Sequence, residues 1–174
     1  MTRIIEHAVT ALRGCKLELV ILSGQAPQRV WGVPLRVVDS LAYEEQRSAA
    51  SPAQLADDLQ TAARDALGAL PDLWHVHNHS LGKNLALPGA LHALADTGQR
   101  LLLQLHDFAE DGRPLNYRRL RRVVGEGDGA RLVQRLYPQA GQVHYAVLNG
   151  RDRKLLAAAG IPPSRLHALA NPVR

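Results

Sequence analysis

The segment RLLLQLHD, residues 100–107, decides the fold, because its apolar run ends in two polar residues. Two further runs, DLWHVHN at 72–78 and VHYAVLN at 143–149, have a similar form. Such runs are typical of strands buried in a parallel sheet. Helical patterns separate them at spacings too long for hairpins, so we expect right-handed crossovers. The prediction is an α/β fold with an open parallel sheet covered by helices on both faces.

Further elements extend this pattern toward both ends of the chain. We expect additional strands at 16–24, where KLELVILSG is typical of a strand buried on both faces, at 35–38 and at 165–173. Helices are expected at 2–13, from 52 to a stop at Pro71, at 87–95, from near Asn116, at 130–136 and at 151–159. In the helix that begins near Asn116, we expect Leu120, Val123 and Val124 to face inward. The length of 174 residues predicts one domain, 1–174.

Composition narrows the functional classes without selecting one. Hydrophobic residues make up 46% of the chain, and the formal charge is +5, from 21 Lys and Arg against 16 Asp and Glu. This excess of positive charge could attract phosphate, an anionic membrane or nucleic acid. Nucleic acid is not expected, because aromatic residues are only 4% and no recognition motif is present. The single cysteine, Cys15, cannot form an internal disulfide, which fits the reducing cytoplasm.

Polar residues follow the predicted strands at their carboxyl ends. In open α/β sheets the loops at these ends form the ligand crevice. We therefore predict a site from the polar residues of these loops, together with Arg153 in a following helix: His77, Asn78, His79, His106, Asp107, Asn149 and Asn171. His106 is the predicted catalytic residue, because a histidine at a strand end can donate a hydrogen bond to a hydroxyl.

Three other motifs suggest ligands. HVHNH at 75–79 could point several imidazoles at a zinc ion, but no second cluster has metal-ligand spacing, so we expect no metal. Lys83, between Gly82 and Asn84, lacks the full phosphate-loop pattern, and we predict only an anion site there. The basic run Arg118–Arg122 is either a solvated helix face or a contact with an anionic membrane or a lipid-linked acceptor.

Taken together, four segments resemble a known family. These are DLWHVHNHSLGKN, LLLQLHDFAED, VHYAVLNGRDRKLLAAAGIPPSRLHAL and the closing ANPV. In their order and spacing they resemble the N-terminal domain of GT-B glycosyltransferases, in the retaining glycosyltransferase 4-like group. The resemblance implies a Rossmann-like three-layer sandwich that forms the acceptor-side half of a two-domain enzyme. It implies a nucleotide-sugar donor, a saccharide or lipid-linked acceptor, and no cofactor.

The resemblance also implies roles for particular residues. His106 matches the strand-end histidine that reaches the donor sugar, and His77 with Asn78 matches the acceptor side of the cleft. Where the family usually has serine, this chain has Leu148 and Asn149. The chain begins inside what resembles the family's first helix and ends where the donor domain should begin. We therefore expect a sheet without its first strand, an absent C-terminal donor domain, and little or no transferase activity from this polypeptide alone.

Two alternatives stay open at this point. A non-catalytic α/β binding module could use the same crevice, and a metal-dependent hydrolase could use HVHNH. For localisation, we expect a cytoplasmic protein that contacts the inner face of the membrane through the Arg118–Arg122 helix.

Overall fold

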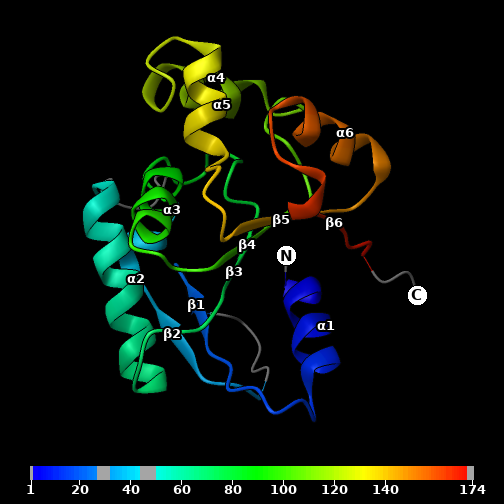
Figure 1. Cartoon of the computed structure of the whole chain (residues 1–174). Coiled ribbons are helices and arrows are strands. Elements are labelled where there is room, and N and C mark those ends of the chain that lie inside the picture. The colour runs from blue at the N-terminus through cyan, green and yellow to red at the C-terminus, as the bar shows by residue number, and fades with distance from the viewer. Residues whose placement is uncertain (1, 27–31, 44–49, 172–174) are drawn as a thin grey trace.

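The computed structural model describes residues 2–26, 32–43 and 50–171, and it contains two parallel sheets (Figure 1). The larger sheet has the order β3-β4-β5-β6, with bounds Trp74–His77, Leu101–Leu105, Val143–Val147 and Leu166–Ala168. The smaller sheet pairs β1 (Ile21–Ser23) with β2 (Leu35–Val37). The predicted α/β fold with parallel strands is confirmed.

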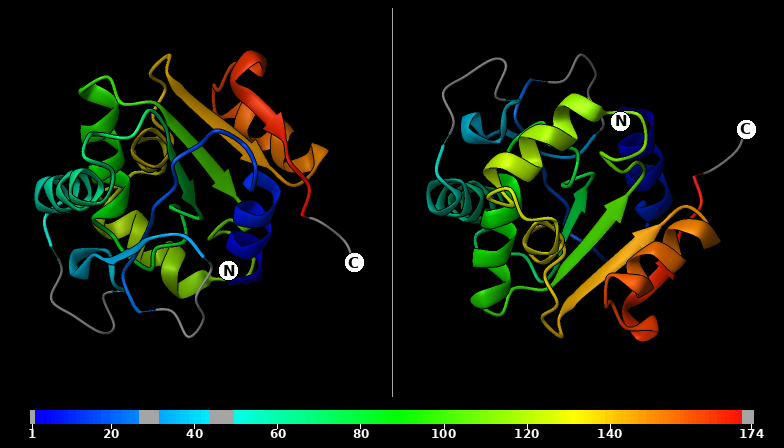
Figure 2. Two further views of the ribbon diagram at one scale, coloured as in Figure 1. Left: turned by 90° about the horizontal axis from the view of Figure 1, so that it is seen from below. Right: turned by 90° about the horizontal axis from the view of Figure 1, so that it is seen from above.

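Helices connect the strands. Their bounds are α1 (Thr2–Leu12), η1 (Asp39–Leu41), α2 (Pro52–Leu67), α3 (Leu87–Asp96), α4 (Pro114–Val123), α5 (Gly129–Leu136), α6 (Gly150–Ala158) and η2 (Pro163–Arg165). Figure 1 and the view from above in Figure 2 place α4 and α5 above the larger sheet, whereas α1 lies below it. Successive strands of this sheet are neighbours, so right-handed crossovers place their connecting helices on one face.

The hydrophobic core lies between this covered face and the helices. β4 and β5 contribute alternate side chains that are at most 1% exposed: Leu101, Leu103, Leu105, Val143, Tyr145 and Val147. The helices contribute buried residues in the same cluster, among them Leu55, Leu59, Leu91, Leu94, Leu132, Leu136 and Leu156. The buried Tyr145 hydroxyl donates a hydrogen bond to the carbonyl of Pro138 at 2.8 Å. The core is therefore aliphatic and centred on β4 and β5.

The opposite face of the larger sheet carries polar residues. Because strand residues alternate between faces, His75 and His77 of β3 lie on this side, with Leu102 and Gln104 of β4 in register beside them. Among the described helices, α1 is the one that Figure 1 shows on this side. The expectation that β3 is buried is therefore wrong for its histidine face, where His75 is exposed.

Several boundaries differ from the sequence predictions. The strand expected at 165–173 covers only Leu166–Ala168, and residues 172–173 lie outside the described part of the chain. The strand expected at 16–24 is only Ile21–Ser23 and is half-buried, and Leu17 before it is 58% exposed. The helix that begins at Pro52 ends at Leu67 instead of at Pro71, because Gly68 adopts a left-handed φ of 75°. The Gly68 N–H then closes the helix on the Arg64 carbonyl at 2.8 Å.

One inward-facing residue was also predicted wrongly. Val123 of α4 is 53% exposed, whereas Leu120 is fully buried and Val124 is 9% exposed. Residues 120 and 124 are one helical turn apart and fill the inner side of the helix, so residue 123 falls on its outer side.

The sidedness of the sheet predicts different costs for two adjacent leucines. Leu103→Ala should lower the free energy of unfolding by about 2–5 kcal/mol, because Leu103 is completely buried under the helices. Leu102→Ala, the matched change on the other face of β4, should cost distinctly less. Urea unfolding of both variants measures the difference, and equal losses would contradict the deeper burial of Leu103.

Candidate functional site

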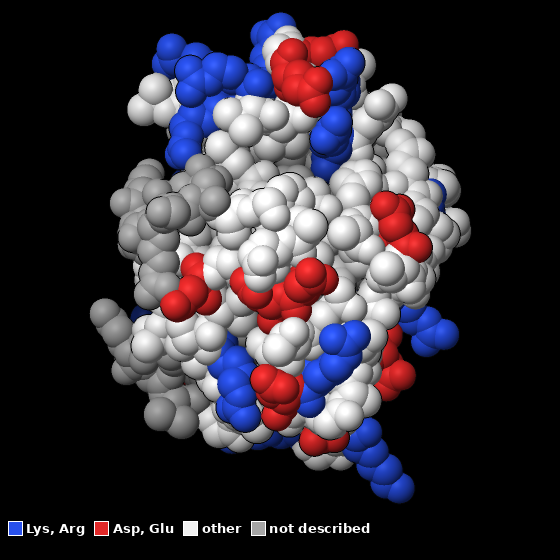
Figure 3. Space-filling view, turned by 90° about the vertical axis from the view of Figure 1, so that its left-hand side faces the viewer, with Lys and Arg blue, Asp and Glu red and all other residues white. Residues whose placement is uncertain are grey.

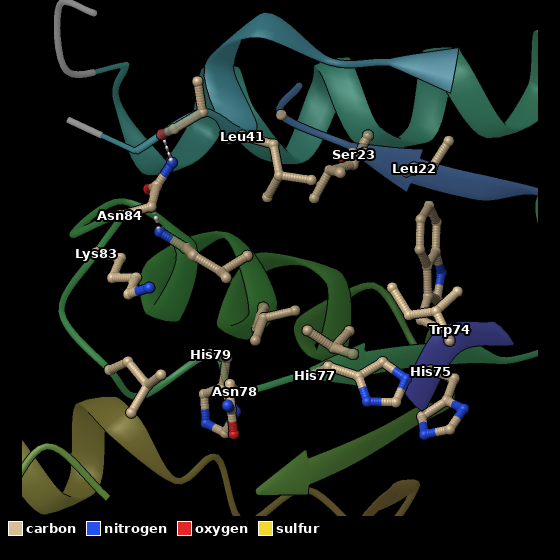
Figure 4. Close-up of a pocket in the computed structure, with 18 of the residues that line it drawn as sticks. Leu22, Ser23, Leu41, Trp74, His75, His77, Asn78, His79, Lys83 and Asn84 are labelled. Atoms are coloured by element: carbon tan, nitrogen blue, oxygen red, sulfur yellow. Dashed lines mark hydrogen bonds between the residues drawn. The ribbon is translucent and has the colours of Figure 1, made fainter. Parts of the chain in front are cut away.

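A cavity of about 500 Å³ lies between the two sheets. Its walls include Leu22 and Ser23 of β1, and on β3 both faces of the strand: Trp74 and Val76 on one, His75 and His77 on the other. Figure 4 shows Leu22 and Ser23 across the cavity from Trp74 and His77. The cavity therefore follows the edge of β3 that has no strand partner among the described residues.

The position of this cavity matches the general rule for ligand sites in open α/β sheets. β2 lies on the far side of β1, whereas the strands after β3 add on the opposite side. The direction of strand addition thus reverses between β1 and β3. At such a switch point the loops at the carboxyl ends of the strands separate and leave a crevice.

His77 and His106 meet at the carboxyl ends of β3 and β4. Their ring nitrogens Nδ1 of His77 and Nε2 of His106 are 3.0 Å apart, and the rings stack with centroids 5.3 Å apart. His75 continues the array, with its ring 4.3 Å from that of His77 and its Nε2 2.8 Å from the Gln104 side-chain oxygen. The structure thus brings these two strand-end histidines into contact.

Asn78 holds the two strand ends together. Its side-chain oxygen accepts hydrogen bonds from the backbone N–H of His106 at 2.7 Å and of Asp107 at 3.3 Å. Its own N–H donates to the Gln104 carbonyl at 2.8 Å. Asn78 has a left-handed φ of 54°, a conformation that asparagine adopts more readily than most residues. The chain therefore leaves β3 sharply at this residue.

This turn explains why the three histidines of HVHNH do not converge. His75 and His77 share a face of β3, but His79 lies beyond the turn and is only 2% exposed. Its Nε2 donates to the carbonyl of Leu136 at 2.8 Å. His79 touches the cavity wall while its ring is anchored to the end of α5. Among the described residues, no group of three or more His, Cys, Asp or Glu side chains has the geometry to hold a metal ion.

The Gly82–Asn84 loop is organised by Asn84. Its side-chain oxygen accepts from the N–H groups of Ala86 and Leu87 at 3.0 and 3.1 Å, so it occupies donors at the start of α3. Its amide nitrogen donates to the carbonyls of Ser40 and Ala42. Lys83 lines the cavity, with Nζ 4.5 Å from the centroid of the Tyr43 ring. A positive charge thus lies at the cavity, although Asn84 already uses part of the helix N-terminus.

Of the remaining predicted residues, Asp107 lines the cavity, whereas Asn149, Arg153 and Asn171 do not. His106 is not in the cavity wall either and reaches the cavity through its contact with His77. Asn171 interacts with the His106 side chain. Asp107 lines the cavity and pairs with Arg113 at 3.2 Å. Asn149 caps α6, where its side chain accepts from the N–H of Asp152 at 3.0 Å. Arg153 is exposed in the first turn of α6 and is not part of the cavity wall.

Three residues of the site were missed by sequence reasoning. Arg113, at the N-cap of α4, lines the cavity beside Asp107. Gln104 holds His75 from within a strand that is otherwise apolar, and a lone polar residue in such a run is a usable signal. Gly24 lines the cavity where a Cβ atom would lie 2.5 Å from the Ala42 backbone. Only glycine allows this close approach, but no pattern in the sequence indicates that Gly24 lies against Ala42.

Burial keeps the histidines of the site uncharged. Burial is the main cause that lowers the pKa of His77 to about 3, and the neighbouring His75 and His106 lower it further. Burial also lowers the pKa of His106, an effect that Asn171 and Asp107 oppose. The pKa of His79 falls to about 4, again chiefly through burial. At neutral pH the imidazoles of the cavity are therefore neutral and can both donate and accept hydrogen bonds.

The hydrogen bonds of the Asn78 side chain predict an order of stability among three variants. Asn78→Ala should lower the free energy of unfolding by about 1–3 kcal/mol, because two N–H groups lose their acceptor and the left-handed backbone stays strained. Asn78→Gly should lose less, since glycine relieves the strain. Asn78→Asp keeps the acceptor and should be the most stable of the three. Urea unfolding measures the order. An alanine variant as stable as the aspartate variant would show that the Asn78 hydrogen bonds do not stabilise the fold.

The lowered pKa values predict that acid destabilises the fold. Below about pH 6.5 the unfolded chain takes up protons on His77 and His79 that the folded chain does not bind, so stability falls as pH falls. Each such histidine contributes up to about 1.4 kcal/mol per pH unit in this window. Urea midpoints measured from about pH 7 to about pH 5 should fall, with a shallower slope in His77→Gln. A flat profile would show that these side chains are not buried in the neutral form.

Comparisons with known proteins give one curated relative. The chain is 31% identical over 102 residues to mannosylglucosyl-3-phosphoglycerate synthase of Petrotoga mobilis, a glycosyltransferase. The match covers 58% of this chain but only 19% of the relative. No protein-family model matches the chain, and no solved structure matches it at a significant level. The chain is thus distantly similar to a glycosyltransferase over a small part of that enzyme's length.

Proposed function

We propose that this domain is the acceptor-side half of a retaining GT-B glycosyltransferase that uses a nucleotide-sugar donor. The observation that carries the proposal is the neutral His77–His106 pair at the carboxyl ends of β3 and β4, in which His77 lines a cavity at a sheet switch point. The distant similarity to a glycosyltransferase supports the same class of reaction.

The chemistry of glycosyl transfer suits two neutral imidazoles. The sugar passes through a state with positive charge at its ring, and an anionic diphosphate leaves. A neutral imidazole can hydrogen-bond a sugar hydroxyl without placing a second positive charge beside that ring. In this proposal, His106 contacts the donor sugar. His77 holds the His106 ring through their 3.0 Å contact, so that the face of His106 toward the sugar is fixed.

The cations of the cavity suit an acceptor that carries negative charge. Lys83 and Arg113 line the wall, and Arg113 is balanced by Asp107 whereas Lys83 lies over the Tyr43 ring. The name of the Petrotoga relative describes a glycosylated phosphoglycerate, which is an anionic product. We assign the acceptor, a saccharide or a lipid-linked saccharide, to the side of the cavity formed by Lys83 and Asn78.

The same proposal includes a strand between β1 and β3 and a second domain for the donor. β1 pairs with β2 and β3 with β4, and the cavity runs between their other edges. Backbone N–H and C=O groups at a strand edge need partners, and a further parallel strand would supply them and join the sheets into one. Such a strand would fill the part of the cavity between the two strand edges and would leave the carboxyl-end rim at His77, Asn78 and Lys83 for the acceptor. A donor domain outside these 174 residues would close the cleft over His106.

Ligand binding to the 174-residue chain tests the proposal. We expect mono- or disaccharides, offered with and without a phosphoglycerate group, to shift the NMR signals of the His77 and His106 rings. Nucleotide sugars should show little turnover with these 174 residues alone, because the proposal assigns donor binding to a second domain. Because His106 contacts the donor sugar in this proposal, His106→Gln should weaken binding of the monosaccharide that corresponds to that sugar roughly tenfold, the loss of about one hydrogen bond.

His144→Gln is the matched control. His144 stacks on His167 elsewhere on the same sheet face, 2.9 Å apart between ring nitrogens. It is in register with Leu102 near the start of β4, away from the strand end that carries His106. This variant should bind like the unmodified chain. The proposal fails if no saccharide binds at millimolar concentration or if both glutamine variants weaken binding equally. Robust transfer by the isolated chain would overturn the requirement for a donor domain.

A further inference from the structure

Helix α4 (Pro114–Val123) presents two chemically different sides. Its inner side is anchored: Leu120 is completely buried, and Asn116 donates from its side chain to the Leu81 carbonyl at 2.9 Å. Gly82 packs so closely on Leu120 that a Cβ atom there would lie 2.9 Å from the leucine side chain. The helix therefore has a fixed rotation about its axis, and this rotation determines which residues face outward.

The outer side combines basic and apolar residues in one stripe. Residues 115, 118, 119, 122 and 123 follow the spacing i, i+3, i+4, i+7, i+8, which places them on a single helix face. Leu115 and Val123, at the two ends of this outer stripe, are 67% and 53% exposed. Arg118 and Arg122 between them are exposed. The two apolar side chains lie about 12 Å apart along the axis, from the 1.5 Å rise per residue.

Within the described part of the chain, two charges of the outer stripe, those of Arg118 and Arg122, lie outside the ion pairs with nearby carboxylates. Among the described residues, no Asp or Glu forms an ion pair with Arg118 or Arg122. The acidic residues of the neighbouring segments have other partners, since Glu126 pairs with Arg131 and Arg135, and Asp111 pairs with Arg151. Figure 3 shows basic side chains at the α4 and α5 end of the molecule, with a smaller acidic group between them. This end therefore carries a local positive potential.

We propose that the outer stripe of α4 docks the protein on an anionic lipid surface. Basic residues near such a surface are attracted to the headgroups, and exposed apolar side chains at both ends of the stripe enter the boundary of the acyl region. A helix with this pattern lies in the plane of the interface. None of the described helices is long and apolar enough to cross a membrane, so α4 acts as a surface contact.

The exposed leucine and valine distinguish a lipid surface from a polyanion. Nucleic acid would engage the arginines but would leave Leu115 and Val123 in water, and single-stranded nucleic acid is usually held by aromatic stacking. No aromatic residue lies in the outer stripe. A soluble phosphate would likewise gain nothing from the two apolar side chains.

Docking through α4 has a consequence for the cavity, and this consequence rests on the proposed function. Arg113, the N-cap of α4, lines the cavity and is only two residues from Leu115. A surface-bound helix would thus hold one wall of the cavity close to the lipid headgroups. A lipid-linked acceptor could then enter without leaving the membrane.

Vesicle flotation of the whole chain tests the docking proposal. Vesicles of phosphatidylcholine mixed equally with phosphatidylglycerol should bind the protein at least tenfold more tightly than pure phosphatidylcholine, with loss of binding at high salt. Arg118→Glu with Arg122→Glu should reduce binding at least tenfold, since each basic residue contributes about fivefold. Leu115→Ser with Val123→Ser should reduce it several-fold while leaving the charge unchanged.

A control pair comes from α6. Lys154→Glu with Leu155→Ser changes one exposed basic and one exposed apolar residue outside α4, and it should leave vesicle binding within twofold of the unmodified chain. Circular dichroism verifies that each variant is folded. Equal loss in the α4 and α6 variants, or no loss in the serine variant, would overturn docking by the outer stripe. So would binding of soluble glycerophosphoglycerol or single-stranded DNA as tight as vesicle binding. Saccharide binding is a separate measurement, so failure here leaves the proposed function intact.

Discussion

The site depends on the Asn78 side chain, whose single oxygen receives N–H groups from two consecutive residues at the end of β4. Parallel pairing brings the ends of β3 and β4 to one edge of the sheet, but pairing alone does not position the loops beyond them. The Asn78 contacts supply that position and fix His106 against His77. Without them, the position of His106 relative to His77 would depend only on the loop that follows β4.

The histidines of the cavity illustrate how burial changes the chemistry of a residue. A solvent-exposed imidazole titrates near neutrality, but the His77 ring lies among apolar atoms and two other imidazoles, which disfavour its protonation. A pair of neutral rings can share one hydrogen bond at 3.0 Å, whereas two charged rings would repel each other. The cavity therefore offers hydrogen bonding with little net charge at the pair, and its positive charge lies at Lys83 and Arg113.

Much of this fold could be predicted from local patterns. The apolar runs of β4 and β5 identify central strands, and the Ser51 cap identifies the start of α2, because each signal lies within a few consecutive residues. The site needed information of longer range. That His79 leaves the face of His75 follows from a backbone angle at Asn78, and that Gly24 must be glycine follows from its approach to Ala42, 18 residues away. The length of β1 was overestimated because an apolar run indicates burial only if another element covers it.

The separation of the two sheets has a consequence for ligand entry. Within the described residues no backbone ladder connects β1 with β3. Without the further strand proposed above, the segment that carries β1 and β2 can therefore open while the hydrogen bonds of the larger sheet stay intact. Local opening of this kind costs far less free energy than global unfolding. The cavity thus has one rigid wall, built on β3 and β4, and one compliant wall. A bulky ligand could enter the cavity when the compliant wall moves, while the histidine pair keeps its geometry.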